Sequence, residues 1–141
     1  MIALKRFGQN FLTDKNILSL IISRAELNPD DRVLEIGPGH GVLTWALLDS
    51  KISCLHSIEL DERLRPELEE LERCEKNFRL HWGDAVKFDY ESLTPFPNKV
   101  IANIPYNITT PLIWNLLKFS SRGLNYFLFM LQNLCRNIIF F

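Results

Sequence analysis

The sequence predicts an α/β domain built on a parallel β-sheet with helices on both faces. Two observations carry this prediction. Short apolar runs, typical of buried strands, alternate with longer segments whose apolar residues recur at helical spacing. No internal repeat, low-complexity tract or linker rich in Gly and Ser interrupts this alternation, so the 141 residues fit a single domain.

The individual elements follow from local sequence signals. The segments expected to form strands are 32–37, 52–60, 78–85, 99–104 and 124–131. The segments expected to form helices are 16–27, 42–50, 61–75 and 110–119. Asp14 can cap the first helix. In the third, Leu64, Leu68 and Leu71 share one face, and Pro66 falls in the first turn, where its missing N–H matters least.

Composition limits the classes of function. Hydrophobic residues make up 47% of the chain and charged residues 23%, which is ordinary for a globular protein. The net charge of −1 argues against a general binder of polyanions. The first 24 residues carry Lys5, Arg6, Lys15 and Arg24 against Asp14 alone. That local charge of +3 either faces phosphate or forms a solvated surface.

Cysteine usage and hydropathy bear on the compartment. The three cysteines are odd in number, widely spaced and without paired metal-ligand spacing, which argues against a disulfide framework. No apolar run approaches the length of a membrane span, and the first residues lack the apolar core of a signal peptide. We therefore expect a cytoplasmic protein with no metal and no membrane partner.

Ligands of such sheets bind at the carboxyl ends of the strands, so the residues just past each strand are interpreted together. After the first strand comes EIGPGHG, where Gly37, Gly39 and Gly41 allow a tight turn and a close approach to a ligand. The following helix start suits an anionic group. The Lys-Ser or Lys-Thr pair of a phosphate-binding P-loop is absent, and Val42 replaces the third glycine of the dinucleotide fingerprint. A plain strand-to-helix turn is the alternative.

Carboxylates follow the next two strands. Glu59 stands 18 residues after Gly41, where an acid can accept both hydroxyls of a ribose. Asp84 can accept a hydrogen bond from an adenine amine, and the Ala85 N–H can donate to the ring. Each also has a local interpretation, Glu59 as an acid near a helix start and Asp84 as a turn residue. Together and in this order they predict an adenosine site.

The fourth strand ends in NIPYNITTP, residues 103–111. The Asn103 side-chain oxygen and the Ile104 carbonyl can accept the two N–H groups of an adenine amine and so direct its lone pair. Pro105 favours an extended Ile104, and Tyr106 can stack on a base swung out of its strand. No strong general base is needed, because the methylated nitrogen loses its proton to water. The alternative is an Asx turn with Tyr106 packed on the next helix.

Four segments resemble the ribosomal RNA adenine dimethyltransferases: KRFGQNFL at 5–12, LEIGPGHGVLT at 34–44, GDA at 83–85 and NIPYNITTPLI at 103–113. The match spans residues 5–132, and the GPG turn with TTPLI is more similar to the small-subunit enzymes than to the large-subunit, resistance-conferring ones. The resemblance implies a Rossmann-like class I methyltransferase fold over residues 1–141. It also implies S-adenosylmethionine as donor and the amines of two adjacent adenosines in ribosomal RNA of the precursor small subunit as acceptors.

The resemblance implies cofactor-binding roles for Asn10, Leu12, Gly37, Gly39, Glu59, Asp84 and Asn103. In that assignment Asn103 lies between the donor and the target amine. Asn103, Ile104 and Tyr106 are accordingly the candidate catalytic residues. The role of Asn10 rests on the resemblance alone.

The chain departs from the family after FMLQ, where the family continues with a charged helix and this chain has NLCRNIIFF. We therefore expect the domain to be incomplete at its C-terminal end, without the last strands of the sheet. One alternative function is a non-catalytic RNA-binding or ribosome-assembly fragment that keeps only the cofactor pocket. Another is a nicotinamide-dependent dehydrogenase, which Val42 disfavours.

Overall fold

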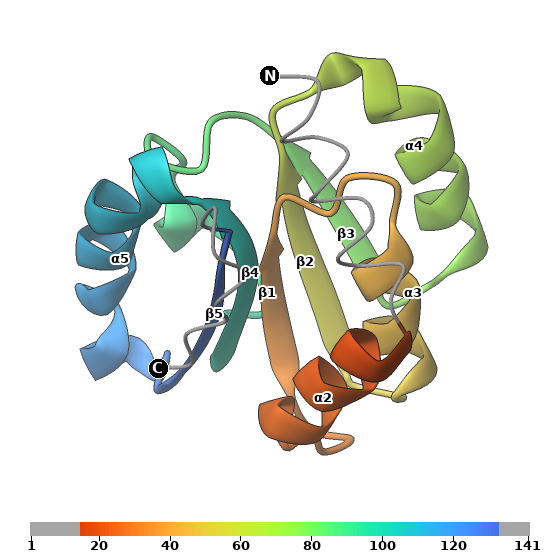
Figure 1. Cartoon of the computed structure of the whole chain (residues 1–141), viewed down its shortest axis with the longest axis horizontal. Helices are drawn as coiled ribbons and strands as arrows, with labels where there is room; N and C mark the ends of the chain where they lie inside the picture. Colours follow the sequence, from red (N-terminus) through yellow and green to blue (C-terminus); the bar gives the residue numbers. More distant parts are fainter. Residues whose placement is uncertain (1–14, 133–141) are drawn as a thin grey trace.

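Five parallel strands form one sheet in the order β3-β2-β1-β4-β5 (Figure 1). The structure is a computed structural model that describes residues 15–132. The strands are β1 (Arg32–Ile36), β2 (Cys54–Glu59), β3 (Phe78–Trp82), β4 (Lys99–Pro105) and β5 (Tyr126–Gln132). All five strand predictions are confirmed, with ends that differ by a few residues.

Within residues 15–132, four α-helices alternate with the strands: α2 (Lys15–Ala25), α3 (Val42–Asp49), α4 (Arg65–Cys74) and α5 (Thr109–Leu117). Short 3-10 turns lie at Glu62–Leu64 (η1), Tyr90–Ser92 (η2), Tyr106–Ile108 (η3) and Ser120–Arg122 (η4). The predicted helices are confirmed, and Pro66 stands in the first turn of α4 as expected. The expected cap Asp14 lies outside the described residues.

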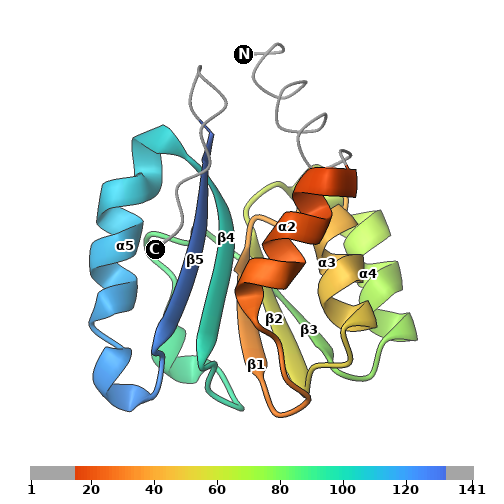
Figure 2. The ribbon, with the colours of Figure 1, turned by 60° about the horizontal axis from the view of Figure 1, so that its bottom comes forward.

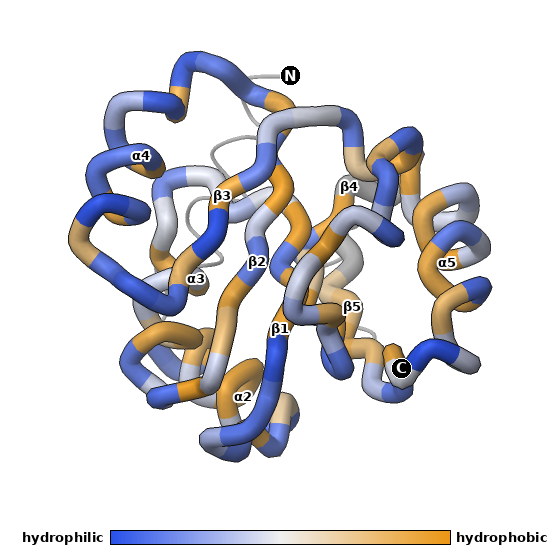
Figure 3. The backbone as a smooth tube through the Cα atoms, turned by 180° about the vertical axis from the view of Figure 1, so that it is seen from behind, coloured by the Kyte–Doolittle hydropathy of each residue, from blue (hydrophilic) through white to orange (hydrophobic). Residues whose placement is uncertain are grey.

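The helices cover both faces of the sheet, as predicted (Figure 2). Helices α2, α3 and α4 lie on one face, where their apolar residues pack with Val33, Leu55 and Ile101. Helix α5 lies on the other face, where Leu112 and Leu116 pack against the sheet. Figure 3 shows the contrast between α4, which is mostly hydrophilic, and α5, which is mostly hydrophobic. The sheet therefore has a hydrophobic core on each face. Successive side chains of a strand point to opposite faces, so alternate residues pack into one core or the other.

The strand order reverses between β1 and β4. From β1 the chain builds outward through β2 to β3, and it then returns to the other side of β1 to form β4 and β5. The β1–β4 register ends at Ile36 opposite Ala102, so β4 runs on from Asn103 to Pro105 paired with β5. In open α/β sheets, ligands bind where the order reverses, outside the carboxyl ends of the strands. This position lies between Gly37 and Asn103.

A buried ion pair ties the opposite end of the sheet to α2. The Lys99 ammonium lies 2.9 Å from an Asp31 carboxylate oxygen, and the two residues are 7% and 4% exposed. The ammonium also donates to the carbonyls of Ala25 and Glu26 at the end of α2. Asn98 donates to the second Asp31 oxygen.

Among residues 15–132, no helix is long and apolar enough to cross a membrane.

Candidate functional site

The turn after β1 depends on glycine because of its backbone angles. Gly37, Gly39 and Gly41 have φ values of 73°, 58° and 88°, which side chains other than hydrogen rarely tolerate. A Cβ added at Gly39 would meet no atom within 4 Å, so the backbone there faces open space. The three glycines therefore serve the turn conformation, and Gly39 leaves its surface accessible to a ligand.

Glu59 joins this turn to the end of β2. The Gly39 N–H donates to Glu59 Oε2 at 3.1 Å, and the Leu60 and Asp61 N–H groups donate to Oε1 at 2.9 Å. The main-chain oxygen of Glu59 accepts from the Gly83 N–H at 2.9 Å, which brings the turn after β3 to the same place. The structure thus brings together the ends of three strands that the sequence singled out. The three amides leave about one acceptor position of the carboxylate unused.

Asp84 makes the local turn that its sequence context allows. Its Oδ1 accepts from the Val86 N–H at 2.9 Å, and its carbonyl accepts from the Lys87 N–H at 3.0 Å. Among the described residues Oδ2 accepts no hydrogen bond, so this partly buried carboxylate keeps an acceptor beyond the end of β3. The turn interpretation and the ligand interpretation are therefore compatible.

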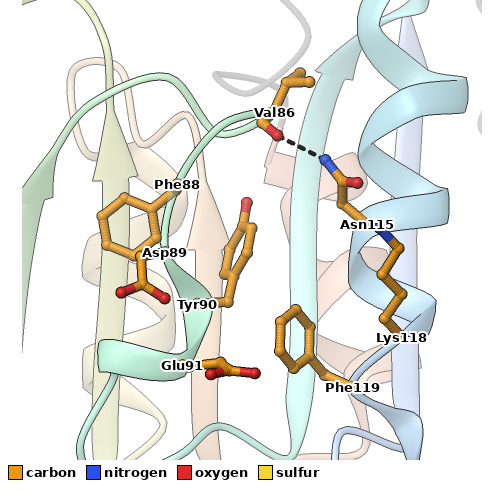
Figure 4. Close-up of a pocket in the computed structure, with 8 residues that line it drawn as sticks. All are labelled: Val86, Phe88, Asp89, Tyr90, Glu91, Asn115, Lys118 and Phe119. Carbon is orange, nitrogen blue, oxygen red and sulfur yellow. Dashed lines mark hydrogen bonds between the residues drawn. The ribbon is translucent and has the colours of Figure 1, made fainter.

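Two side chains hold the loop that follows Asp84 through its backbone carbonyls. The Tyr90 hydroxyl donates to the carbonyl of Ala85 at 2.6 Å, and the Asn115 amide donates to the carbonyl of Val86 at 2.6 Å (Figure 4). Burial, with repulsion from Asp84 in the same direction, raises the pKa of Tyr90 above its usual value, so its hydroxyl remains a donor. A hollow of about 330 Å³ opens between this loop and α5. Its lining includes Phe88 and Phe119 but none of the sequence-predicted site residues.

Asn103 and Ile104 occupy the part of β4 that extends beyond β1. Asn103 is partly buried, and its backbone oxygen would lie 3.6 Å from a Cβ placed on Gly37. Asn103 is already engaged in an interaction with its surroundings. Ile104 is fully buried in β4 in extended backbone. Tyr106 begins η3 directly after the strand. The structure places these residues at the reversal point, and their catalytic roles stay predictions.

Two further assignments fall outside what the structure covers. Asn10 and Leu12 precede the described residues, so their cofactor contacts stay predictions. The stacking role of the Tyr106 ring also stays a prediction, since the structure describes its backbone alone.

Two site residues were missed from the sequence. Leu60 follows Glu59 directly and is 66% exposed, which places an apolar side chain beside the carboxylate. An apolar residue after a strand-ending acid is the signal that would have identified it. Glu35 is 1% exposed within β1 and accepts hydrogen bonds from Thr44 and Ser57. Its burial raises its pKa to about 7, with repulsion from Glu59 in the same direction and the two hydroxyls opposing.

Comparison with known proteins shows which family this chain resembles. The family model described as ribosomal RNA adenine dimethylase matches residues 3–137. The ribosomal RNA small subunit methyltransferase A of Pseudomonas syringae pv. syringae (strain B728a) is 49% identical over 121 residues, covering 84% of this chain and 45% of that protein. The protein of the same name from Prochlorococcus marinus (strain MIT 9211) is 53% identical over 119 residues, covering 82% and 41%. This chain thus spans less than half the length of these relatives.

Solved structures agree on the fold. A dimethyladenosine transferase from Plasmodium falciparum superposes with a TM-score of 0.70 at 35% identity, covering 85% of this chain and 42% of that one. The 23S rRNA methyltransferase ErmE superposes with a TM-score of 0.71 at 31% identity, covering 86% and 48%. The fold is that of Rossmann-like class I methyltransferases, as expected. The chain belongs to the ribosomal RNA adenine dimethylase family.

Proposed function

We propose that residues 1–141 form an S-adenosylmethionine-dependent methyltransferase domain. Its reaction is dimethylation of the exocyclic amines of two adjacent adenosines in small-subunit ribosomal RNA. The observation that carries this proposal is the 3.1 Å hydrogen bond between Gly39 and Glu59. It brings the glycine turn and the strand-ending acid together where the strand order reverses. Membership of the family supplies the reaction type.

The described residues fit the adenosine part of the cofactor. Glu59 has about one acceptor position left, which can accept from one ribose hydroxyl. The second ribose hydroxyl either donates to a carboxylate oxygen that already accepts from a backbone amide or takes the place of that amide. Leu60 offers an exposed apolar surface to the face of the adenine. The second oxygen of Asp84 can accept from the adenine amine. Each of these groups matches a chemical feature of adenosine.

The methionine part fits the glycine turn. The backbone at Gly39 faces open space, and Gly41 caps α3 without a side-chain hydrogen bond, so the first-turn amides are available. The carboxylate of an amino acid is a suitable anion for these amides. When bound, S-adenosylmethionine supplies a methyl group made electrophilic by its positively charged sulfur.

The substrate amine meets the end of β4. An adenine amine is a weak nucleophile, because its lone pair is delocalised into the ring. The Asn103 side-chain oxygen and the Ile104 carbonyl hold its two hydrogens, which draws the lone pair out of the ring plane. Tyr106 stacks on the target base from the following turn. The proton leaves to water after methylation, so no strong base is assigned.

The names of the relatives guide the choice of substrate. The Pseudomonas and Prochlorococcus relatives are named as small-subunit ribosomal RNA methyltransferases. We extend that substrate to this chain, with the precursor small ribosomal subunit as partner and the cytoplasm as location. The rival proposal, a fragment that binds RNA without catalysis, shares the cofactor pocket and differs in methyl transfer alone.

A calorimetric titration with S-adenosylhomocysteine tests the proposal. We expect the chain to bind S-adenosylhomocysteine and not NADH. Glu59→Ala removes a charged acceptor and is expected to cost roughly 1.5–3 kcal/mol, a loss of about ten- to hundredfold in affinity. Glu69→Ala is the matched control, because Glu69 pairs with Arg65 on the surface of α4. Equal affinity of the Glu59→Ala and Glu69→Ala proteins would remove the site assignment.

A further inference from the structure

A fully buried carboxylate lies beneath the glycine turn. Glu35 accepts from the Thr44 hydroxyl, which lies 3.0 and 2.8 Å from its two oxygens, and from the Ser57 hydroxyl at 2.6 Å. Both donors are neutral, and both are fully buried. Burying a carboxylate costs free energy, and the hydrogen bonds from these two hydroxyls offset part of that cost.

The three hydrogen-bonded residues come from three separate elements. Glu35 lies in β1 and is the cross-strand partner of Ser57 in β2. Thr44 is the third residue of α3. The carboxylate therefore joins two strands to the first turn of the helix that follows the glycine turn.

The start of α3 has no side-chain cap. The helix has eight residues, and Gly41 at its N-cap provides no side-chain hydrogen bond. A side-chain cap typically contributes about 1 kcal/mol, and a capped helix start would have fewer free amides for a ligand. The Thr44–Glu35 hydrogen bond fixes the first turn of α3 from within the core. The backbone amides of that turn are therefore not occupied by a capping side chain.

This cluster lies directly under the proposed cofactor contact. Ser57 and Glu59 are two residues apart in β2 and so point to the same face of the sheet. The Gly37 N–H donates to the carbonyl of Ile58 at 3.0 Å, between these two residues. The glycine turn therefore rests on β2 above the Glu35–Ser57 pair and reaches Glu59 through Gly39.

We propose that Glu35 is a positioning residue for the cofactor site. By accepting from Thr44 and Ser57 it fixes the first turn of α3 against β1 and β2. It thereby holds the glycine turn where Gly39 meets Glu59. This inference rests on the proposed cofactor site, and it adds a residue that does not itself touch the cofactor.

The positioning depends on the ionised form. Both hydroxyls lie within hydrogen-bonding distance of Oε2, and the negative charge of a carboxylate strengthens these two bonds. A protonated carboxyl is neutral and carries a hydrogen on one oxygen, so it holds the two hydroxyls more weakly. Burial raises the pKa of Glu35 to about 7, and both forms are populated near neutral pH. The charged group that acts on it is Glu59, whose repulsion favours the protonated form. Lowering the pH below 7 is therefore expected to loosen the turn.

The test is the pH dependence of S-adenosylhomocysteine affinity, measured by calorimetry on the 141-residue chain. If only the ionised form positions the turn, affinity falls about tenfold from pH 8 to pH 6. Glu35→Gln keeps an acceptor oxygen but loses the charge and does not titrate, so this variant is expected to bind S-adenosylhomocysteine weakly and with a flat profile over this range. Thr44→Val keeps the carboxylate and removes one link, and it is expected to bind several-fold more weakly at pH 8.

Ser50→Ala is the matched control, because the Ser50 hydroxyl bonds to Ala46 at the opposite end of α3. It is expected to bind as the parent does at both pH values. Folded Glu35→Gln or Thr44→Val protein with parental affinity and the parental pH profile would overturn the inference and leave the cofactor site standing. Failure of the parent to bind at either pH would instead overturn the proposed function and this inference with it.

Discussion

At the scale of single residues, Glu59 and Asn103 have different proposed roles, cofactor binding for Glu59 and methyl transfer for Asn103. Glu59 meets the glycine turn through its side chain and the turn after β3 through its backbone, and we propose that it binds the cofactor. Asn103 stands on the other side of the reversal point, in the extension of β4. The two residues should therefore respond differently to substitution.

Asn103→Ala is expected to lower methyl transfer far more than RNA binding. Losing one acceptor aimed at developing charge typically costs on the order of a hundredfold in rate. RNA affinity depends mainly on spread phosphate contacts, which this change leaves alone. Single-turnover transfer to precursor small subunits measures the effect, with this chain joined to the C-terminal half of the Pseudomonas syringae relative. Parental rates in an Asn103→Ala protein that binds both substrates would contradict the mechanism.

Tyr106 provides a contrast within the same turn. Tyr106→Ala is expected to weaken the flipped-out base by roughly 1–3 kcal/mol of stacking. Tyr106→Phe keeps the ring face and should transfer methyl groups at nearly the parental rate. The same single-turnover assay compares the two variants. A Tyr106→Phe protein as impaired as Tyr106→Ala would assign the role to the hydroxyl and refute stacking.

At the scale of elements, a histidine pair links β2, β3 and the loop before β4. His56 Nε2 donates to the carbonyl of Pro95 at 2.8 Å, so its Nδ1 is the acceptor for His81 Nε2 at 2.9 Å. Burial lowers the pKa of His56 to about 4, with the hydrogen bond to Pro95 opposing and repulsion from His81 acting in the same direction as burial. Protonating His56 in the folded state would remove the acceptor on which the pair depends.

The pH dependence of stability follows from this shift. The unfolded chain binds a proton at His56 near pH 6.5 and the folded chain only near pH 4, so stability is full above pH 6.5 and falls between these values. The loss is on the order of 2–3 kcal/mol. Glu35 has the opposite sign, since its raised pKa makes the folded state gain protons over about pH 4.5 to 7.

The His56→Gln variant separates the pH dependence due to His56 from that due to Glu35. Urea unfolding of the parent and of His56→Gln at pH 7.5 and pH 5 gives the His56 contribution as the difference between the two pH dependences. Gln keeps an amide that can donate to Pro95 but does not titrate. If the parent and His56→Gln lose equal stability between these pH values, the folded-state pKa of His56 is not lowered.

At the scale of the whole molecule, the sheet has a structural end and a functional end. The Asp31–Lys99 pair anchors α2 at the amino ends of the strands, and the glycine turn, Glu59 and Asn103 gather at the carboxyl ends. Burial raises the pKa of Asp31, but hydrogen bonds from Asn98 and Lys99 outweigh it, and the net shift is downward. Its stabilisation is present above the unfolded pKa and is lost as the pH falls through the lower, folded value.

Asp31→Ala should therefore destabilise the fold strongly. It leaves the Lys99 ammonium buried without its carboxylate, and breaking such a pair typically costs about 3–5 kcal/mol. Arg73→Ala is the matched control, because Arg73 pairs with Glu70 on the exposed surface of α4 and should change stability by less than about 1 kcal/mol. Urea denaturation at pH 7.5 compares them. Equal stability losses in the two variants would contradict the anchoring role.

The sequence predicted most of this arrangement because the signals are local. Apolar periodicity located each strand and helix, and the order of Gly37, Glu59 and Asp84 at strand ends predicted a shared site. The hydrogen bonds from Gly39 and Gly83 to Glu59 show that these strand ends lie together, and their cofactor roles stay predictions. Glu35 was missed because its partners lie 9 and 22 residues away and only the fold brings them together.

The missed histidine contact has the same cause. The His56–His81 contact spans 25 residues, and the strand register alone creates it. Leu60 differs, because its position directly after the strand-ending Glu59 is a local signal, although its 66% exposure is known only from the structure. Local signals thus predict elements and strand ends, whereas buried polar pairs require the register.

The measurement that tests the central claim most directly is a nuclear magnetic resonance titration of the ¹⁵N-labelled chain with S-adenosylhomocysteine. We predict that the amides of Gly37, Gly39, Leu60 and Ala85 shift together with one saturation curve. The amides that line the hollow beside α5, including those of Glu91 and Lys118, should stay in place. Shifts confined to that hollow, or no shifts at saturating ligand, would contradict a cofactor site at the reversal of strand order.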